Sequence, residues 1–300
     1  MESSGADGLR LRLRSRTLTV HPGRPLLMGV LNASPESFSD GTLVSGAGGP
    51  GRRGAQLLAE GADIIDVGGE SGVTNRPPIT AEEEIGRVLP VVDELVAAGA
   101  IVSVDTWKPP VVEAVLEAGA HLINDVSGLR DPAVAGLCAR FGAGLVIMHN
   151  RAEPKVKAFP AYDDVGGDVV RFLDGRMSEA LAQGLTVEHL ILDPGPDFAK
   201  TPAQTIAVLR DLRLLHRFER PILLAVSRKD FIGALTMSRP RLRLGGTLAA
   251  VGEGVDAGAS IVRVHDVAAT ADFLTVRAAL RGEIDVRPDL HLPEALRREP

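Results

Sequence analysis

The chain has 300 residues, a formal net charge of −6 and an isoelectric point near 5.7. Its basic residues are dispersed and only 3% of its residues are aromatic, which argues against the basic stripe and stacking platform of a nucleic-acid-binding protein. No apolar run is long enough to span a bilayer, and the first 20 residues lack an apolar signal core. The sequence therefore predicts a cytoplasmic protein without membrane contact. The single cysteine, Cys138, stands in an apolar helix-like segment and is predicted to be a packed thiol.

Three segments differ in pattern along the chain. Residues 1–23 include an alternating stretch that reads as a short hairpin, expected to close the bottom of the main domain. Residues 24–282 alternate apolar, strand-like runs with amphipathic, helix-like runs. Residues 283–300 are charged and rich in proline, which predicts a loose tail. The length fits one large α/β domain between these two extensions.

Eight strand-like segments share one feature, which is a polar or ionisable cluster at the C-terminal end. The residues concerned are Asn32, Asp66 and Glu70, Asp105, Asn124 and Asp125, His149, Asp193, Arg228 and Lys229, and Arg263 and His265. A buried strand gains nothing from such residues, whereas in a parallel barrel all eight C-terminal strand ends meet on the face that carries the active site. The pattern predicts a single-domain (β/α)8 TIM barrel. An open doubly wound sheet is the alternative, but no GxGxxG motif follows the first strand.

Local signals place the helix boundaries and two long loops. Thr80 followed by Glu83 resembles a capping box, and Pro109 marks the start of another helix. The residues after the first strand, SPESFSDGTLVSGAGGPGRR, are too many for an ordinary turn, so we expect a mobile loop that closes on a substrate, with a tolerated insertion as the alternative. A second such loop, SGVTNRPPIT, follows the second strand.

Nine motifs in order carry a family resemblance. MGVLNASPESFSDG and DVGGES resemble the first two signatures of the dihydropteroate synthases, and the likeness continues through SVDTWKP, NDVSGLRDP, MH, LDPGPDFAK, SRKDFIG, GGTLA and RVHDV. It covers roughly residues 24–282. The resemblance implies a TIM barrel that joins 4-aminobenzoate to a dihydropterin diphosphate with loss of pyrophosphate, using Mg²⁺. It also implies a homodimer formed through the late helices.

The resemblance assigns roles to the strand-end residues. Asn32, Arg263 and His265 match the anion and magnesium positions, with Asn32 as the metal ligand. An arginine that ends an apolar strand is costly to bury without an anionic partner, which supports an anion site. Carboxylates and an amide suit the donor edge of a pterin ring, and the matching readers are Asp105, Asn124 and Asp193.

The remaining matches concern the pterin carbonyl and the second substrate. Lys229 is expected to meet the pterin carbonyl, so that Asp105, Lys229 and Asn32 form the catalytic set. Phe198, Arg76 and Asp230 are the further substrate-binding residues. The resemblance implies that the C–O bond of the pterin methylene breaks first, without a covalent enzyme nucleophile. His149 is as compatible with a site wall as with catalysis.

Departures from the family pattern gather in the half of the site that holds the amine. Asp230 replaces a serine, and its carboxylate would repel that of 4-aminobenzoate at close range. The second loop is longer and shifts Arg76, and Asp197 and Ala199 stand where two glycines are usual. Three functions follow: a dihydropteroate synthase, a paralogous transferase that couples another amine, or a non-catalytic binder of pterins or diphosphates. The methyltetrahydrofolate-binding branch, which shares the barrel, is a fourth.

Overall fold

A computed structural model describes residues 8–21, 23–33, 49–70 and 78–297. The greater part of the two loops predicted to close on a substrate, residues 34–48 and 71–77, lies outside the described residues, and so does Arg76.

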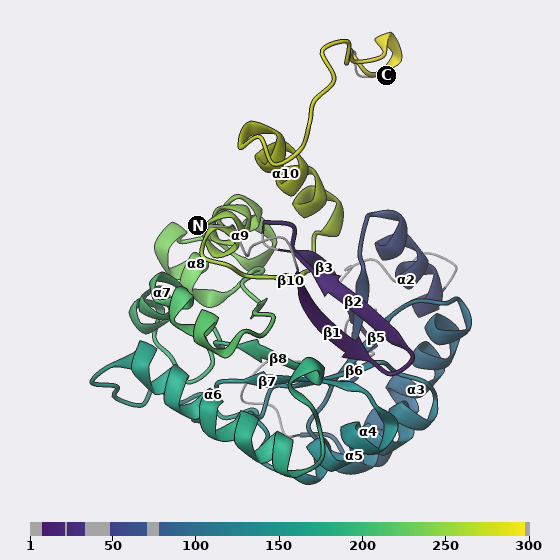
Figure 1. Cartoon of the computed structure of the whole chain (residues 1–300), viewed down its shortest axis with the longest axis vertical. Helices are drawn as coiled ribbons and strands as arrows, with labels where there is room; N and C mark the ends of the chain where they lie inside the picture. Colours follow the sequence, from purple (N-terminus) through teal and green to yellow (C-terminus); the bar gives the residue numbers. More distant parts are fainter. Residues whose placement is uncertain (1–7, 22, 34–48, 71–77, 298–300) are drawn as a thin grey trace, which may run out of the picture.

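Eight parallel strands form the centre of the fold, as predicted. They are β3 (Leu26–Asn32), β4 (Ile64–Gly68), β5 (Val102–Asp105), β6 (Leu122–Asp125), β7 (Gly144–Met148), β8 (Leu190–Asp193), β9 (Leu223–Leu224) and β10 (Ile261–Val264). The hydrogen-bonded order is β8-β7-β6-β5-β4-β3-β10-β9, and a parallel bridge between Leu192 and Ile222 connects the two ends. The sheet therefore curls into a nearly closed barrel, which excludes the open doubly wound alternative (Figure 1).

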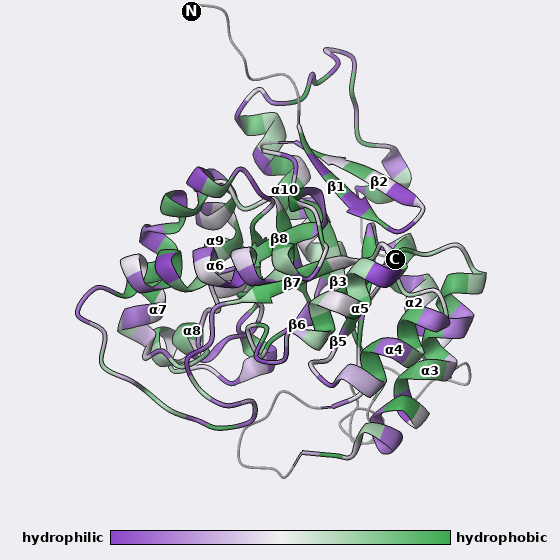
Figure 2. Cartoon of the chain, turned by 60° about the horizontal axis from the view of Figure 1, so that its bottom comes forward, coloured by the Kyte–Doolittle hydropathy of each residue, from purple (hydrophilic) through white to green (hydrophobic). Residues whose placement is uncertain are grey.

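Helices alternate with the strands and surround the barrel (Figure 1). They are α2 (Gly49–Ala59), α3 (Ala81–Ala97), α4 (Pro109–Glu117), α5 (Ala133–Phe141), α6 (Val165–Ala182), α7 (Pro202–Arg210), α8 (Asp230–Thr236), α9 (Leu244–Asp256) and α10 (Val267–Leu280). The short 3₁₀ helices are η1 (Val187–His189), η2 (Leu212–Phe218), η3 (Pro240–Leu242) and η4 (Glu294–Leu296). Figure 2 shows apolar residues along the strands and polar residues on the outward turns of the helices, which is the pattern of a parallel sheet covered on its outer face.

The predicted helix boundaries are confirmed at two places. The Thr80 side chain accepts a hydrogen bond from the backbone N–H of Glu83 at 3.2 Å, which caps α3. Pro109 is the first residue of α4, where its missing N–H costs nothing. Cys138 is fully buried on α5 within the apolar layer between strands and helices, and burial raises the pKa of its thiol. It is a packed thiol, as the sequence predicted.

Two separate apolar layers fill the barrel wall. One set of strand side chains, such as Ile65, Val67 and Val104, packs outward against the helices. The alternate set packs inward at the N-terminal ends of the strands, and its strand members are Met28, Ile64, Leu122, Val146, Ile191, Leu223 and Ile261. Successive side chains on a strand face opposite sides, so the residues two or four positions after this inward set also belong to the interior row.

An N-terminal hairpin lies at the same end as the inward apolar set. Strands β1 (Leu9–Leu13) and β2 (Arg16–Val20) pair in an antiparallel manner, and Figure 1 shows them across the ring of strands. Leu11, Leu13 and Val20 are buried in one cluster with the inward residues of the barrel strands. The hairpin thus closes the N-terminal end, and the opposite end is left for chemistry.

The C-terminal segment after α10 runs away from the barrel in Figure 1, and residues 285–297 are exposed. Within the described part of the chain, no helix combines the length and apolarity needed to cross a membrane.

Candidate active site at the carboxyl ends of the strands

The interior row of side chains changes from apolar to polar toward the C-terminal ends of the strands. Counting in twos from the buried apolar set leads to Asp66, Asn124, Asp193 and Arg263, and Asp105 stands two residues after the buried Ser103 of β5. Asp105 pairs in register with Asn124 on β6 and with Gly68 on β4. The sequence therefore brings the predicted pterin readers and the predicted anion-binding arginine to one place.

Arg263 is the centre of a hydrogen-bonded cluster. Its Nε donates to Oδ2 of Asp66 at 2.6 Å, and its Nη2 donates to Oδ2 of Asp105 at 2.9 Å. The Nδ2 of Asn124 donates to the same Asp66 oxygen at 3.2 Å. Burial lowers the pKa of Arg263, but the two carboxylates outweigh burial and raise the pKa. The guanidinium is therefore a permanent charge between Asp66 and Asp105.

Two acceptor atoms of this cluster are unsatisfied. Oδ1 of Asp66 and Oδ1 of Asn124 are buried and have no hydrogen-bond partner among the described residues. Unpaired buried acceptors are rare and costly. They indicate a place where a ligand supplies N–H donors.

Burial also acts on the neighbouring carboxyl groups. It raises the pKa of Asp105 to about 7, against the positive charge of Arg263, which lowers it. It raises the pKa of Asp193, although the Gly195 backbone N–H donates to Oδ1 of Asp193 at 2.7 Å and opposes that rise. Perturbed carboxyl groups that share a site are typical of enzyme active sites.

Lys229 lies at the same end of the barrel, after β9. Burial lowers its pKa, and the carboxylates of Asp197 and Asp193 act in the opposite direction. Its Nζ stands 4.2 Å from the centre of the Phe198 ring, within the range of a cation–π contact. Two predicted substrate-binding residues, Lys229 and Phe198, are therefore in direct contact.

His265 and Asn32 occupy the strands next to each other in the barrel. The Nδ1 of His265 lies 3.0 Å from Oγ of Ser227, and that hydroxyl accepts from the His265 backbone N–H at 3.2 Å. Burial, then the charges of Arg263 and Arg228, lower the pKa of His265 to about 3, so its imidazole is neutral. Asn32 is exposed at the end of β3, which pairs with β10.

Asp230 does not join this group. Its side chain is 74% exposed at the start of α8 and forms an ion pair with Arg243 at 3.0 Å. Arg228, the neighbouring arginine, is held instead by Asp266 through two hydrogen bonds of 3.1 and 2.6 Å. The negative charge of Asp230 is therefore partly neutralised on the surface.

The structure accounts for the two residues that stand where glycine is usual, Asp197 and Ala199. Asp197 and Ala199 have φ angles of 65° and 50°, in the left-handed region that favours glycine. Oδ1 of Asp197 accepts from the Thr205 hydroxyl at 3.2 Å, and its Oδ2 accepts from the Phe231 N–H at 3.2 Å. The chain keeps the backbone conformation and adds side-chain contacts that hold it.

Asp125 and His149 are polar strand-end residues that lie outside the interior row. Asp125 accepts hydrogen bonds from the backbone N–H groups of Ser127 and Leu129 at 2.8 and 3.0 Å, so it stabilises the loop after β6. His149 contacts Asp168 on α6 through Nε2 at 2.9 Å. Within the Arg263 cluster, Asp66 is the residue to which the sequence interpretation assigned no role. Its position two residues after the inward-facing Ile64 could have predicted that it faces the barrel interior.

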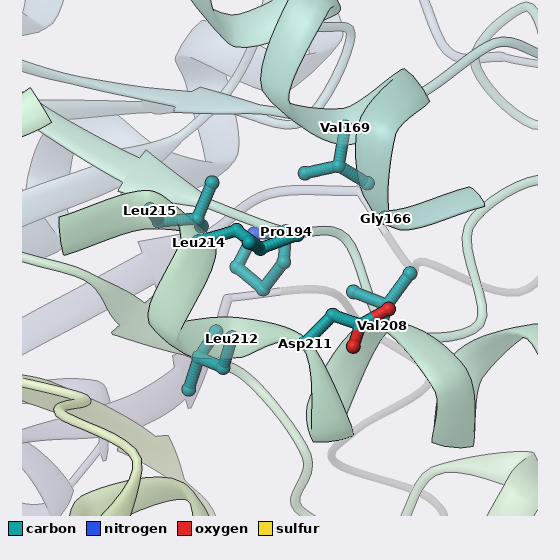
Figure 3. Close-up of a pocket in the computed structure, with 8 residues that line it drawn as sticks. All are labelled: Gly166, Val169, Pro194, Val208, Asp211, Leu212, Leu214 and Leu215. Carbon is teal, nitrogen blue, oxygen red and sulfur yellow. The ribbon is translucent and has the colours of Figure 1, made fainter. Parts of the chain in front are cut away.

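The described hollows lie away from this cluster. One cavity of about 10 Å³ is lined by residues of α6, α7 and η2 and by Pro194. Figure 3 shows its apolar lining residues, such as Leu215, together with Asp211. Its size suits no more than a single water molecule. A wider groove of about 500 Å³ lies along α6 beside Arg151, Arg171 and Arg176. Ion pairs with Asp168 and Glu179 balance these arginines, so neither hollow matches the predicted substrates.

Comparison with known proteins identifies the family. The model of the pterin-binding enzymes matches residues 28–265. The dihydropteroate synthase of Neisseria meningitidis serogroup C is 41% identical over 263 residues, which are 86% of this chain and 93% of the relative. The crystal structure of Xanthomonas albilineans dihydropteroate synthase with 4-aminobenzoic acid superposes with a TM-score of 0.82 at 40% identity, covering 91% of this chain and 98% of that chain.

A third relative was solved with a product. Burkholderia cenocepacia dihydropteroate synthase complexed with 7,8-dihydropteroate has a TM-score of 0.82 and 37% identity, covering 92% of this chain and 98% of that chain. These matches favour the synthase interpretation over a non-catalytic binder. The chain belongs to the pterin-binding enzyme family and is a transferase of the dihydropteroate synthase type.

Proposed function

We propose that this enzyme condenses a dihydropterin diphosphate with 4-aminobenzoate and releases pyrophosphate. The observation that carries the proposal is the pair of unpartnered acceptors on Asp66 and Asn124, within a charged cluster at the barrel end. A pterin edge presents several N–H donors in one plane, which such acceptors bind well. Asp105 and Asp193 supply further carboxyl groups beside them.

The diphosphate half of the proposed substrate would lie toward β3 and β10. Arg263 offers a guanidinium that matches phosphate geometry, and neutral His265 offers a ring N–H. A methyl group in place of the Gly68 hydrogen would lie 3.8 Å from Oδ1 of Asn32 and 3.9 Å from Cβ of Asp105. The Asn32 amide therefore stands beside the pterin readers, exposed toward the open end.

The residues fit a hydrated Mg²⁺ ion held with the substrate. Among the described residues no group of three His, Cys, Asp or Glu side chains surrounds a metal position, but Mg²⁺ is often bound by one or two protein oxygens together with waters and phosphates. Asn32 is the proposed protein ligand. When bound, the ion would neutralise diphosphate charge and so stabilise the leaving group.

In the proposed reaction the methylene C–O bond breaks and its electron pair leaves with pyrophosphate. The amine nitrogen of the second substrate then donates its lone pair to the methylene carbon, forms the C–N bond and loses a proton. Asp105 and Asp193 stabilise positive charge on the pterin, and Arg263 stabilises negative charge on the departing group. No enzyme nucleophile is required.

The pairing of Asp230 with Arg243 removes the main objection to 4-aminobenzoate. A carboxylate partly neutralised at 3.0 Å exerts a weaker field on an anionic amine than an isolated one. Lys229 and Phe198 then offer a cation and an aromatic face beside the pterin readers. These residues support the anionic amine as the second substrate.

The test uses purified protein, the dihydropterin diphosphate, Mg²⁺ and 4-aminobenzoate, and follows pyrophosphate and dihydropteroate separately. The proposal expects equal amounts of both products. Pyrophosphate without dihydropteroate would indicate a transferase for another amine. Substrate binding without either product would indicate a non-catalytic binder.

We also propose a homodimer formed through the late helices. Several large apolar side chains of α8 to α10 and their connections are exposed, among them Leu235 (65%), Met237 (90%), Leu242 (75%) and Leu280 (83%). Exposed apolar side chains that gather on neighbouring elements are typical of interfaces. The molar mass from light scattering should halve in Met237→Glu. Leu296→Glu, which alters an exposed apolar residue of the tail (68% exposed), is the control and should leave the mass unchanged.

A further inference from the structure

Lys200 is a fully buried lysine at the end of the loop between β8 and α7. Its exposure is 1%, and its Nζ makes three short contacts, to Nδ1 of His149 at 2.7 Å, the Gly195 carbonyl at 2.9 Å and the Phe198 carbonyl at 3.0 Å. A fourth acceptor, the His149 carbonyl, lies at 3.4 Å. An ammonium group has three N–H donors, so the three short contacts use its full capacity.

The partners of Lys200 are neutral, which is unusual for a buried lysine. His149 Nε2 faces the Asp168 carboxylate at 2.9 Å, so Nε2 carries the proton and Nδ1 is left as an acceptor. Burial lowers the pKa of Lys200 to about 7, while Asp193 is the largest influence in the opposite direction. Burying this amine costs folding free energy. Its contacts hold the Gly195 and Phe198 carbonyls in place.

One contact leads directly to a pterin reader. The N–H of Gly195 donates to Oδ1 of Asp193 at 2.7 Å, and the carbonyl of the same residue accepts from Lys200. Gly195 has a φ of +66°, and a Cβ at this position would lie 2.1 Å from the His149 carbonyl oxygen. The orientation of this one peptide segment therefore sets the position of the Asp193 carboxylate.

A second contact leads to the residue beside Lys229. Lys200 binds the carbonyl of Phe198, whose ring lies 4.2 Å from the Lys229 ammonium. Phe198 stands between Asp197 and Ala199, both left-handed. Each such non-glycine residue costs about 1 kcal/mol or more and persists only where surrounding contacts fix it. Tyr162 assists by donating from its hydroxyl to the Ala199 carbonyl at 3.0 Å.

We infer that Lys200 is a positioning residue of the transfer reaction: its ammonium fixes the Gly195 and Phe198 carbonyls and thereby places Asp193 and the Phe198–Lys229 pair around the pterin. It acts through these residues and does not touch the substrate. His149 and Asp168 hold the ammonium from the helix side. This inference rests on the proposed function, since it assigns Asp193 and Lys229 to pterin binding.

The decisive variant is Lys200→Met, which keeps length and removes the donors. Lys157→Met, on an exposed lysine of the loop before α6, is the matched control. Calorimetry measures two ligands separately: a dihydropterin without phosphate, and pyrophosphate with Mg²⁺. We expect the pterin Kd to rise roughly 10- to 100-fold, because small misplacements of site groups have effects of that size. The pyrophosphate Kd should hardly change, because the hydrogen bonds described for Arg263 and His265 go to Asp66, Asp105 and Ser227 and not to the Lys200 loop. The control should match the wild type for both.

Thermal unfolding shows whether the variant is folded. A folded Lys200→Met protein with wild-type pterin affinity and wild-type kcat would overturn the inference. If Lys200→Met does not fold, Lys200→Gln replaces it, because the amide retains two donors but neither the charge nor the full reach. Its pterin Kd should then exceed that of the wild type with pyrophosphate binding intact, and an unchanged pterin Kd would again overturn the inference. A wild-type protein that binds no pterin would overturn the proposed function as well, which separates the two failures.

Discussion

Arg263 and Asp66 form an ion pair of 2.6 Å between β10 and β4, the two strands that flank β3 in the barrel. The same guanidinium reaches Asp105. A residue that the sequence assigned to diphosphate binding thus also orients Asp105, which the sequence assigned to the pterin. The two halves of the substrate are therefore coupled through one side chain.

This coupling separates two variants that the sequence alone would treat alike. His265→Ala should raise the Kd for the diphosphate substrate about 10- to 100-fold, the usual loss for a hydrogen bond to a charged group, with little effect on a pterin that lacks phosphate. Arg263→Ala should weaken both ligands, because Asp66 and Asp105 lose their shared partner. Calorimetry with both ligands measures the difference. If both variants weakened the diphosphate substrate and left the phosphate-free pterin unaffected, the two halves of the site would not be coupled through Arg263.

Arg263→Ala should also destabilise the fold, since removing one partner of a buried pair leaves an uncompensated charge that costs about 3–5 kcal/mol. Asp66→Asn in the same chain removes that charge while keeping the shape. Chemical denaturation should show the double variant to be more stable than Arg263→Ala alone. If the second substitution lowers stability further, Asp66 is stabilised by groups other than Arg263.

Asp105 makes pterin binding and stability depend on pH in opposite directions. Its pKa rises from 3.8 to about 7 on folding, so its protonated form favours the folded state. That contribution is complete below pH 3.8 and is lost as the pH rises through about 7. Pterin affinity should instead increase between pH 5.5 and 7.5, because the ionised carboxylate accepts hydrogen bonds from the pterin.

Asp105→Asn tests both dependences with one isosteric change. The variant should remain folded, bind the pterin weakly and show a flat affinity profile across the same range. Titration calorimetry and thermal melts at several pH values provide the data. A wild-type profile that is equally flat would rule out Asp105 as the titrating group.

The charge on Asp230 should affect the second substrate only when Arg243 is absent. Asp230→Ser alone should change kcat/KM for 4-aminobenzoate little, because an exposed, paired carboxylate is worth less than about 1 kcal/mol. Arg243→Met should lower kcat/KM by exposing that charge, and Asp230→Ser should restore the activity in the double variant. Steady-state kinetics of the four proteins form a mutant cycle. A large gain from Asp230→Ser alone would mean that the ion pair does not screen the carboxylate.

Removing Mg²⁺ should have the same effect as removing the Asn32 amide. Chelation should raise the pyrophosphate Kd of the wild type, whereas Asn32→Ala should bind pyrophosphate weakly with or without Mg²⁺, because magnesium sites commonly rely on one or two protein oxygens. Binding of a phosphate-free pterin provides the control and should be indifferent to both changes. A clear Mg²⁺ response in Asn32→Ala would place the metal on other ligands.

Residue spacing alone predicts which polar strand residues face the barrel interior, without any motif match. Asp66, Asp105, Asn124, Asp193 and Arg263 lie at even intervals from buried residues of their own strands. The same counting places Asp125 and His149 on the outer side, where the structure has them. The two-residue period of a strand fixes the face of each side chain, so this division needs no tertiary contact.

The roles of Asp230 and Lys200 could not be predicted from spacing. The substitution at residue 230 was visible in the sequence, but its partner Arg243 is the N-cap residue of α9, so the ion pair depends on how α8 and α9 pack. Lys200 gave no sequence signal beyond its place in LDPGPDFAK, because its three acceptors come from its own turn and from His149, which follows β7.

The sequence by itself determined the barrel, the strand ends that form the site and the family, because these depend on hydrophobic period, turn residues and ordered motifs that are local along the chain. Only the tertiary structure decided which charges are paired and which acceptors are left open. Ion pairs such as Arg263 with Asp66 join residues 197 positions apart. Their energies depend on distance and burial, and neither is encoded in local spacing.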